Sequence, residues 1–310
     1  MKKGKVAQEP LVWILILNFN KWQDTIDCID SLKGIEYHNY RILVIENGST
    51  NDSFDILSEK LKGVEIVRIK KNAGYTGGIN FGLEILLKRQ SDYILLLNND
   101  TLVEKDFLSI LVNEIEKNKN AAAACSTILT EHNRKEIWYA SGKIIKWRGL
   151  AVHVDKGKEF NSNFYQPAIR TEFITGCLML LKTKYLSDIG LENDKIFLYL
   201  DDIEYSIRIR KKGYELLYVP KSIIYHKVLG EKENTYKLYY SVRNRLLLIS
   251  IAFEGLSKLI AYLYYIIVIL YKLSLWRLTN KAFYKAAKMG LTDYLKKNFY
   301  KGNGDMFTYR

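Results

Sequence analysis

Residues that could hold a metal ion and a phosphate group follow the apolar run at 93–97. Asn98, Asn99 and Asp100 come directly after it, at the end of a strand that we expect to be buried on both faces. A charge next to such a strand is costly unless something compensates it. A divalent cation held by one carboxylate and by substrate phosphates would do so, and proteins usually bind magnesium in this way. The alternative is a strand that ends in a polar turn, since Asn and Asp are ordinary turn residues.

A second acidic cluster, the adjacent Asp201 and Asp202, follows an aromatic and apolar run. It opens a predicted helix that continues to Lys212. Two carboxylates at the start of a helix also interact favourably with the helix dipole, so a purely structural role is the alternative. Glu204 and Arg208 are spaced four residues apart, and this spacing predicts an ordinary surface ion pair on the helix.

The glycine-rich stretch 72–80 lacks both common phosphate-loop patterns, GxGxxG and the P-loop. A backbone that passes close to a ligand would explain Gly74, Gly77 and Gly78, because glycine alone has no Cβ. A tight turn is the alternative. His226 follows a predicted strand, and a single histidine is a metal candidate only where a second ligand lies beside it.

The elements that must position these residues alternate between strands and helices. The predicted strands are 11–17, 41–45, 64–69, 93–97, 121–128, 173–181 (broken at Gly176) and 215–219, with short β-like pieces up to 154. The predicted helices are 22–32, 53–61, 106–118, 201–212 and one that follows the glycine-rich loop 72–80 and runs to about 88. This order predicts an α/β fold with a mostly parallel sheet. Parallel strands end at one edge of a sheet, so Asn18, Glu46, Asn72 and Asp100 are expected to converge there.

Composition and charge restrict the class of protein. The chain has 310 residues, of which 48% are hydrophobic, and this is enough for a large globular core. Cys28, Cys125 and Cys177 lie far apart, which argues against a zinc ribbon or a disulfide framework and fits a reducing compartment. The net charge of +13 favours nucleic acid, an anionic membrane or phosphorylated substrates as partners, without choosing among them.

The last seventy residues differ from the rest of the chain. Their longest uncharged run, 259–271, has a length typical of a core or interfacial helix. The segment 272–310 carries nine Lys/Arg and two Asp, a net charge of +7. At the other end, Lys2, Lys3 and Lys5 precede a polar stretch, so we expect no signal peptide.

Several of these stretches together resemble the inverting family 2 glycosyltransferases of the GT-A fold, and most of all their bacterial rhamnosyltransferase-like members, which build surface polysaccharides. The resemblance covers residues 11–245 and rests on LNFN (17–20), VIENGSTNDS (44–53), NAGYTGGIN (72–80), LLLNND (95–100), FITGCLML (173–180), FLYLDDIEYSIRIRKKGY (197–214) and YHK (225–227). It implies a Rossmann-like, mostly parallel central sheet flanked by helices, in a catalytic domain at 1–235. Residues 236–310 would form a basic helical extension.

The resemblance also implies the residues that bind a nucleotide-sugar. They are Asn18, Asn20, Glu46 and Asn47 around the nucleotide, Asn72, Gly74, Gly77 and Gly78 around the diphosphate, Asn98 and Asn99 at the strand end, and Gly176 beside the sugar and the acceptor. The family usually has Asp where Glu46 stands, so contacts with the base would differ slightly.

The metal and the catalytic base follow from the same resemblance. Asp100 is the only carboxylate left at the family's metal-binding DXD position, and with His226 it would hold Mg²⁺ or Mn²⁺. Asp201 and Asp202 match the family's Glu-Asp pair, whose second member is the general base. We therefore expect Asp202 to be the base. Asp201, directly after Leu200, is expected to cap the helix and so to have a lowered pKa.

The implied activity is metal-dependent, inverting transfer of a sugar from a dTDP- or UDP-sugar, with dTDP-rhamnose among the candidates. The acceptor would be a hydroxyl of a growing cell-surface glycan, such as a capsule, linked to polyprenyl diphosphate. The expected location is cytoplasmic, peripheral on the inner face of the cell membrane, because aromatic residues and cations near 259–276 suit an anionic membrane surface. In the alternative arrangement, these helices pack back on the catalytic domain.

Two other functions compete with this one. A glycosyltransferase that acts on a polyprenyl phosphate would need no base, because a phosphate acceptor needs no deprotonation. A basic nucleic-acid-binding protein would place its cations and aromatic residues on one face. That class leaves the carboxylates at strand ends unexplained, so we expect no nucleic acid partner.

Overall fold

A computed structural model of the chain describes residues 9–161, 167–228 and 234–307. Lys2, Lys3 and Lys5, on which the expectation about a signal peptide rests, lie outside the described residues. The elements in chain order are β1 (Val12–Asn18), α1 (Trp22–Leu32), β2 (Tyr40–Asn47), α2 (Ser53–Lys60), β3 (Glu65–Ile69), α3 (Gly74–Leu86), β4 (Tyr93–Asn98), β5 (Thr101–Val103), α4 (Phe107–Lys117), β6 (Ala121–Thr130), β7 (Ile137–Tyr139), β8 (Gly142–Ile145), η1 (Lys146–Arg148), β9 (Leu150–His153), β10 (Ile169–Arg170), β11 (Leu178–Lys182), η3 (Thr183–Tyr185), α5 (Leu186–Ile189), α6 (Asp201–Lys211), β12 (Glu215–His226), α7 (Thr235–Ala252), α8 (Gly255–Thr279), α9 (Lys281–Leu295) and η4 (Gly304–Met306).

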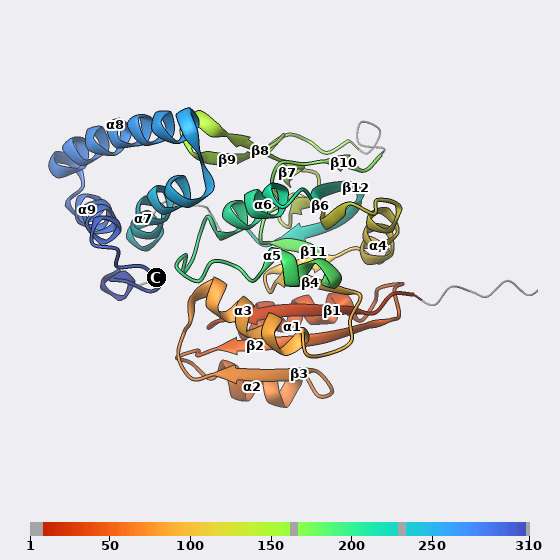
Figure 1. The fold of residues 1–310 in the computed structure, drawn as a ribbon. Coiled ribbons are helices and arrows are strands. Elements are labelled where there is room, and N and C mark those ends of the chain that lie inside the picture. The colour runs from red at the N-terminus through yellow and green to blue at the C-terminus, as the bar shows by residue number, and fades with distance from the viewer. Residues whose placement is uncertain (1–8, 162–166, 229–233, 308–310) are drawn as a thin grey trace, which may run out of the picture.

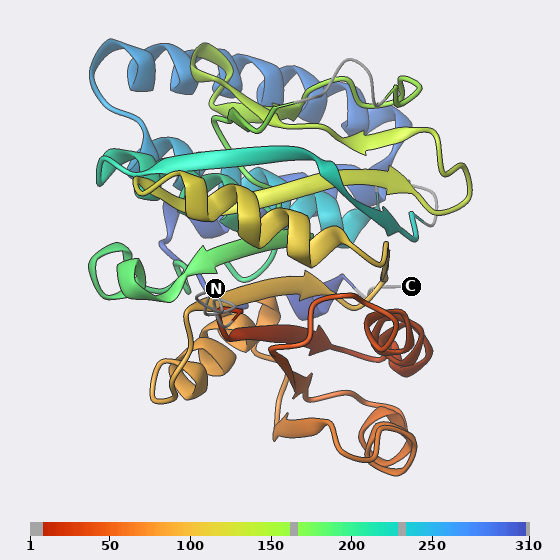
Figure 2. The same cartoon turned by 90° about the vertical axis from the view of Figure 1, so that its right-hand side faces the viewer.

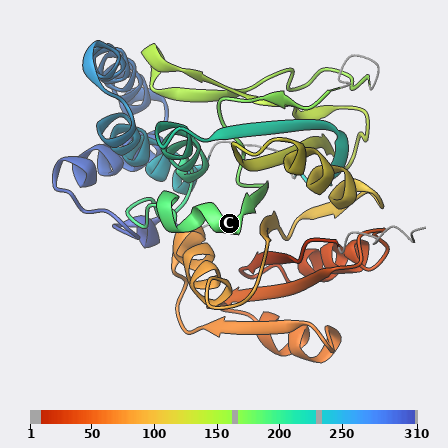
Figure 3. The ribbon, with the colours of Figure 1, turned by 45° about the vertical axis from the view of Figure 1, so that its right-hand side comes forward.

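One large mixed sheet organises the molecule. Its strands follow the order β10-β12-β6-β11-β4-β1-β2-β3, while β5 pairs with β12 and β7 with β6. β1 pairs in parallel with both β2 and β4, and β11 is antiparallel to β4. The first three strands and their helices form one half of the molecule, and the later strands form the other half (Figure 1, Figure 3). This arrangement confirms the predicted α/β class with a mostly parallel central sheet.

The register of the parallel strands brings the predicted polar residues to one edge. Asn18 on β1 pairs with Glu46 on β2, and Leu17 pairs with Asn98 on β4. The strand 93–97 is fully buried, as its apolar run predicts. The expected convergence of strand ends is therefore confirmed for this part of the sheet.

Two predicted strands differ from the structure. β11 begins only at Leu178, because the Ile174 and Gly176 amides donate to the Ser206 and Asp202 side chains instead of joining the sheet. β12 does not end before Pro220 but continues to His226, with a register shift against β6 between Val219 and Ile223. Proline has no N–H to donate to a neighbouring strand, and such an irregularity accommodates it.

The C-terminal helices form a second, smaller core beside the sheet. α7, α8 and α9 lie together at one side of the molecule, with α8 along its outer rim (Figure 1, Figure 2). Their core also takes in Phe197, which precedes α6. The extension therefore packs against the segment that leads to Asp201 and Asp202. The division into domains at residue 235 stays a prediction.

Candidate active site

Asn47 fixes the turn between β3 and α3. Its Nδ2 donates to the Gly74 carbonyl at 2.9 Å and to Asn72 Oδ1 at 3.3 Å, and its Oδ1 accepts the Ala73 amide at 3.0 Å. Asn72 Oδ1 also accepts the Gly74 amide at 2.8 Å. The predicted set Asn47, Asn72 and Gly74 is thus brought together, but the Asn47 amide is used within the chain. Its part in binding a nucleotide-sugar stays a prediction.

The glycines at 74–78 are required by packing inside the protein. They belong to α3 and not to a loop, which corrects the predicted loop. Gly74 has φ +79°, and a Cβ there would lie 2.4 Å from the Phe197 carbonyl oxygen. A Cβ on Gly78 would lie 2.4 Å from a Leu17 methyl carbon on β1, and one on Gly77 would lie 2.9 Å from the Ala73 Cβ. Close approach to a ligand is therefore not needed to explain these glycines.

A cluster of polar side chains forms where β1 and β2 end. Asn18 Oδ1 accepts the Thr25 hydroxyl at 2.9 Å, and Asn20, in the left-handed region with φ 59°, accepts the Thr50 amide at 2.8 Å. Glu46 is fully buried, and its Oε1 accepts the Ser49 amide at 2.8 Å. Its Oε2 lies 3.3 Å from Arg68 Nε without forming a hydrogen bond to any described residue. The Glu46 carboxylate is thus held by Ser49 through one oxygen and paired with Arg68 through the other, and its role in nucleotide binding stays a prediction.

Asp100 and His226 meet at the same edge, from two different strands. Lys227, the residue after β12, donates its backbone N–H to the Asp100 carbonyl at 2.8 Å, and this bond sets His226 beside Asp100. His226 Nε2 lies 3.2 Å from Asp100 Oδ1. That oxygen is buried and forms no hydrogen bond to the described residues. The Trp138 ring stands edge-on against the His226 ring, 4.5 Å between centroids, and so orients the imidazole. The sequence predictions did not include Trp138.

This pair fits a divalent cation. Two adjacent ligands of an octahedral ion at about 2.1 Å lie about 3 Å apart, which matches the separation of Asp100 Oδ1 and His226 Nε2. No group of three or more His, Cys, Asp or Glu side chains converges on a possible metal position within 9–161, 167–228 and 234–307. The remaining ligands would then be water and substrate phosphates, which is how Mg²⁺ is commonly held. Asn99 is turned away, since its Nδ2 donates to Thr25 Oγ1 at 2.9 Å.

The acidic pair at the start of α6 is arranged differently from the prediction. Leu200 occupies the N-cap position, and Asp201 makes no capping hydrogen bond, so the predicted cap is wrong. Burial and the neighbouring Asp202 raise the pKa of Asp201 to about 8. The predicted lowering of its pKa is therefore wrong as well. The physical reason is that Asp201 lies inside the fold, where the cost of burying its charge outweighs the backbone amides of Asp201 and Asp202, which lower the pKa.

Asp202 is partly exposed and faces the Gly176 segment. Its Oδ2 accepts the Gly176 amide at 3.1 Å, and its Oδ1 accepts the Ile203 amide at 2.8 Å. Burial of the carboxylate raises the pKa of Asp202, and these two hydrogen bonds oppose that rise. The neighbouring Cys177 accepts the Asn98 amide through its carbonyl, at 2.9 Å. The Gly176–Cys177 peptide thus connects the Asp202 carboxylate to the strand end that carries Asp100.

Another acidic residue, Glu192, lies near Asp201 and Asp202, and the sequence predictions did not include it. Glu192 is 5% exposed, and its Oε2 has no hydrogen-bond partner among the described residues. Burial and the nearby charges of Asp201 and Asp202 hold the pKa of Glu192 well above its usual value. The Glu204–Arg208 pair forms as predicted, at 3.0 Å, but Glu204 is buried and the pair is not a surface one. No periodicity in the sequence marks Glu192, because it lies in the segment between α5 and α6.

Replacement of Asp201 by Asn should change how stability depends on pH. The Asp201 carboxyl has a pKa of about 8 in the folded protein against 3.8 for the free side chain, so the unfolded chain loses the proton first. Stability from this group is therefore lost as pH rises from about 4 to about 8. Asparagine has no proton to lose. The melting temperature of Asp201→Asn minus that of the wild type should rise between pH 5 and pH 8; a constant difference would contradict the raised pKa.

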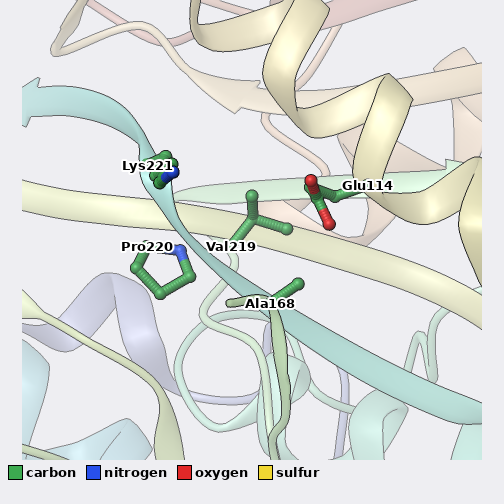
Figure 4. A pocket seen from close by; sticks show the side chains of 5 residues that line it. All are labelled: Glu114, Ala168, Val219, Pro220 and Lys221. Atoms are coloured by element: carbon green, nitrogen blue, oxygen red, sulfur yellow. The ribbon is translucent and has the colours of Figure 1, made fainter. Parts of the chain in front are cut away.

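A small pocket at the kink of β12 lies apart from this site. Glu114, Ala168, Val219, Pro220 and Lys221 line it (Figure 4). Its space of about 10 Å³ is close to the room that one water molecule needs. None of the predicted site residues belongs to it, so it is not a candidate for substrate binding.

Known proteins are similar to this chain in sequence and in fold. Poly-beta-1,6-N-acetyl-D-glucosamine synthase of Staphylococcus epidermidis is 24% identical over 226 residues, which cover 71% of this chain and 51% of the synthase. The chain thus spans about half the length of that relative. Among solved structures, GalNAc-T7 with UDP, GalNAc and Mn²⁺ has a TM-score of 0.64 at 18% identity, covering 79% of this chain and 48% of the other.

A second solved structure matches nearly the whole chain. The mannosyltransferase PcManGT from Pyrobaculum calidifontis, in complex with GDP-Man and Mn²⁺, has a TM-score of 0.56 at 12% identity, covering 97% of this chain and 79% of the other. At such identities these likenesses show the fold, which confirms the predicted GT-A type. Residues 13–190, more than half of the chain, match the family described as Glycosyl transferase family 2. The chain belongs to glycosyl transferase family 2.

Proposed function

We propose that this protein transfers a sugar from a nucleotide diphosphate-sugar to a hydroxyl acceptor, with inversion at the anomeric carbon and with a divalent cation. One observation carries the proposal. The Gly176–Cys177 segment binds the Asp202 carboxylate through the Gly176 amide and the strand end at Asn98 through the Cys177 carbonyl, and two residues beyond Asn98 lies Asp100, whose buried Oδ1 has only His226 beside it among the described residues. Asp100 would hold the cation that binds the donor diphosphate, and Asp202 would take the proton of the acceptor hydroxyl.

The proposed reaction is one direct displacement. The acceptor hydroxyl loses its proton to Asp202 while its oxygen forms a bond to the anomeric carbon. The bond from that carbon to the diphosphate oxygen breaks, and its electron pair leaves with the nucleoside diphosphate. A cation held by Asp100 and His226 would stabilise the charge that develops on this leaving group. No covalent intermediate with the enzyme is required, so the configuration inverts.

Asp202 is preferred over Asp201 as the base on grounds of geometry. The pKa of about 8 at Asp201 would suit a base at neutral pH, but Asp201 is only 6% exposed. A base must first come within hydrogen-bond reach of the proton that it takes, and only then does its pKa matter. Asp202 is partly exposed beside Gly176, which supports access of an acceptor hydroxyl to it.

For the donor we propose a UDP- or dTDP-sugar, with dTDP-rhamnose as the first sugar to test. Glu46 is the residue that would contact the base, since its carboxylate lies at the end of β2 beside Asn18, with Arg68 paired to its Oε2. The experiment is a screen of nucleotide-sugars for release of the nucleoside diphosphate with Mn²⁺ or Mg²⁺. Slow, metal-dependent hydrolysis of at least one donor is expected. No release from any donor, with or without acceptor glycans, would contradict the proposal.

For the acceptor we propose a growing surface glycan linked to polyprenyl diphosphate, on the inner face of the cell membrane. The support comes from α8, whose outer side is an uninterrupted apolar stripe. Large side chains in this stripe are strongly exposed, among them Leu256 at 71%, Leu263 at 57% and Ile267 at 68%. The opposite side of α8 packs on the second core through Ala261, Tyr265 and Ile269. The alternative in which these helices pack back on the protein thus accounts for only one side of α8.

The surroundings of the stripe favour a bilayer over a protein partner. Trp147 in η1 is 53% exposed and stands edge-on against Tyr264 of α8, 4.9 Å between ring centroids. Tryptophan beside an apolar helix face is typical of membrane interfaces. Exposed lysines continue along α9, which agrees with the net charge of +13 and with attraction to anionic lipid. α8 is long and apolar enough to cross a membrane, but its packed side supports a helix that lies in the interface.

Two charges placed on this stripe should abolish membrane binding. Leu263→Glu/Ile267→Glu puts carboxylates where side chains would enter the bilayer, so the variant should no longer float with anionic liposomes, whereas the wild type floats. The matched control is Leu87→Glu/Ile169→Glu, at two exposed apolar positions outside α8. If the wild type itself stays in the soluble fraction, the membrane proposal fails. If, in that case, the wild type is a dimer and Leu263→Glu/Ile267→Glu is a monomer, a second copy of the chain covers the stripe.

A further inference from the structure

The segment directly before the acidic pair has an unusual backbone. Tyr199 and Leu200 are consecutive and both lie in the left-handed region, with φ 67° and 69°. Side chains other than Gly, Asn and Asp rarely adopt this conformation, because their Cβ clashes with the backbone. Such strain persists only where the surrounding structure enforces it, and it is found at functional sites. The next residues are Asp201 and Asp202, whose direction this turn sets.

Asn244 on α7 holds the turn from one side. It is fully buried, and its Nδ2 donates to the Leu198 carbonyl at 2.7 Å and to the Tyr199 carbonyl at 3.3 Å. Just ahead of the turn, the Phe197 ring stacks on Tyr240 of the same helix, with 5.3 Å between centroids and 15° between planes. The C-terminal extension therefore supplies both hydrogen bonds and a stacking surface to the segment 197–199.

α3 holds the same segment from the other side. The Tyr75 amide donates to the Phe197 carbonyl at 2.8 Å, and the Thr76 hydroxyl donates to the Ile196 carbonyl. The Tyr75 hydroxyl reaches on to the Gly176 carbonyl at 2.8 Å. The strained turn is thus fixed between the helix that begins at the glycine stretch and the C-terminal helix α7.

A buried network keeps Asn244 in place. Its Oδ1 accepts Arg243 Nε at 3.0 Å, and Arg243 Nη1 donates to the Tyr239 hydroxyl at 3.4 Å. Tyr239 in turn donates to Asp293 of α9 at 2.6 Å. Arg243 and Asn244 are both fully buried, and their amide and guanidinium groups are costly to bury without these partners. The network thereby connects α9 to the turn.

We propose that Asn244 is a positioning residue: by holding the strained turn at Tyr199–Leu200 it aims the Asp202 carboxylate at the acceptor hydroxyl. The C-terminal helices are in that case part of the catalytic apparatus and not only an extension of it. This inference rests on the proposed function, because it needs Asp202 to be the base. It predicts that loss of the Asn244 donors impairs turnover and leaves donor binding intact, since the donor side of the site has its own supports.

The test is Asn244→Leu, which branches at Cγ as asparagine does and has no hydrogen-bond donor. Its kcat for transfer should fall at least tenfold, while its KM for the donor stays within threefold of the wild type. The matched control is Asn280→Leu, which removes the N-cap of α9 without touching the turn. That variant should lose melting temperature and keep kcat within threefold. Equal loss of kcat in both variants, or a parallel rise in donor KM for Asn244→Leu, would overturn the positioning role.

A second pair of variants covers the case in which Asn244→Leu does not fold. Asn244→Ser is smaller and keeps one hydroxyl donor, so it should fold with an intermediate loss of kcat. An asparagine at position 200 adopts the left-handed conformation more readily than leucine, so the turn of Leu200→Asn needs less support from Asn244. Asn244→Ser should therefore reduce kcat less in the Leu200→Asn protein than it does in the otherwise wild-type protein. The same reduction in both backgrounds would contradict a clamp on a strained turn. If the wild type releases no nucleoside diphosphate at all, the proposed function fails first, and the two failures remain distinguishable.

Discussion

Asp202→Asn should lose sugar transfer by about 10²–10⁴-fold, or roughly 3–5 kcal/mol of barrier, which is the usual contribution of a positioned base. Asparagine keeps the shape of the side chain, and its one carbonyl oxygen can still accept the Gly176 amide that binds Asp202 at 3.1 Å, whereas the second amide, from Ile203, loses its acceptor. What it cannot do is take the proton of the acceptor hydroxyl. Affinity for the nucleotide-sugar should therefore stay nearly normal. The measurement is the rate of transfer and the donor affinity of the same preparation.

Asp201→Asn is the matched control for this loss. With a pKa of about 8, the Asp201 carboxyl is mostly protonated at pH 7, and a neutral amide imitates that state. Its rate should stay within a few fold of the wild type. If Asp201→Asn abolishes transfer while Asp202→Asn remains active, the assignment is reversed. If both remain active, the pair is structural, and a phosphate acceptor, which needs no base, becomes the better interpretation.

Asp100→Asn should reduce activity by about 10²-fold or more, because a Lewis acid contributes several kcal/mol to charge stabilisation. Asp100 is the only carboxylate at its strand end, and its buried Oδ1 has no hydrogen bond among the described residues to replace a lost cation. The wild type should lose activity in EDTA and regain it with Mn²⁺ or Mg²⁺. Asp106→Asn, at an exposed position nearby, is the control and should behave as the wild type. Full turnover in excess EDTA would contradict a metal at Asp100.

The sequence predicted those features that depend on local pattern. Apolar runs and polar strand ends were sufficient for β1, β2 and β4, and for the meeting of Asn18 with Glu46, because parallel strands of similar length end at one edge. The ligand pair Asp100 and His226 needed the resemblance as well, since His226 reaches the edge on a strand far along the chain.

Other features depend on contacts between distant segments, which no local pattern records. The orientation of Asp201 and Asp202 follows from the left-handed turn at Leu200, and Asn244 on another helix holds that turn. Gly78 looks like part of a ligand loop in the sequence, but its lack of a Cβ makes room for Leu17. The same applies to α8, where the exposed side becomes visible only once the packed side is known.

Donor and base are proposed to occupy opposite sides of the Gly176–Cys177 segment, and the most direct measurement is the binding of a nucleoside diphosphate. UDP and dTDP would be titrated calorimetrically into the wild type, Asp100→Asn and Asp202→Asn, each with and without Mn²⁺. We expect one of the two nucleotides to bind to the wild type and to Asp202→Asn only when Mn²⁺ is present. In Asp100→Asn the affinity for that nucleotide should fall at least tenfold. Equal affinity in all three proteins, or binding that ignores Mn²⁺, would contradict it.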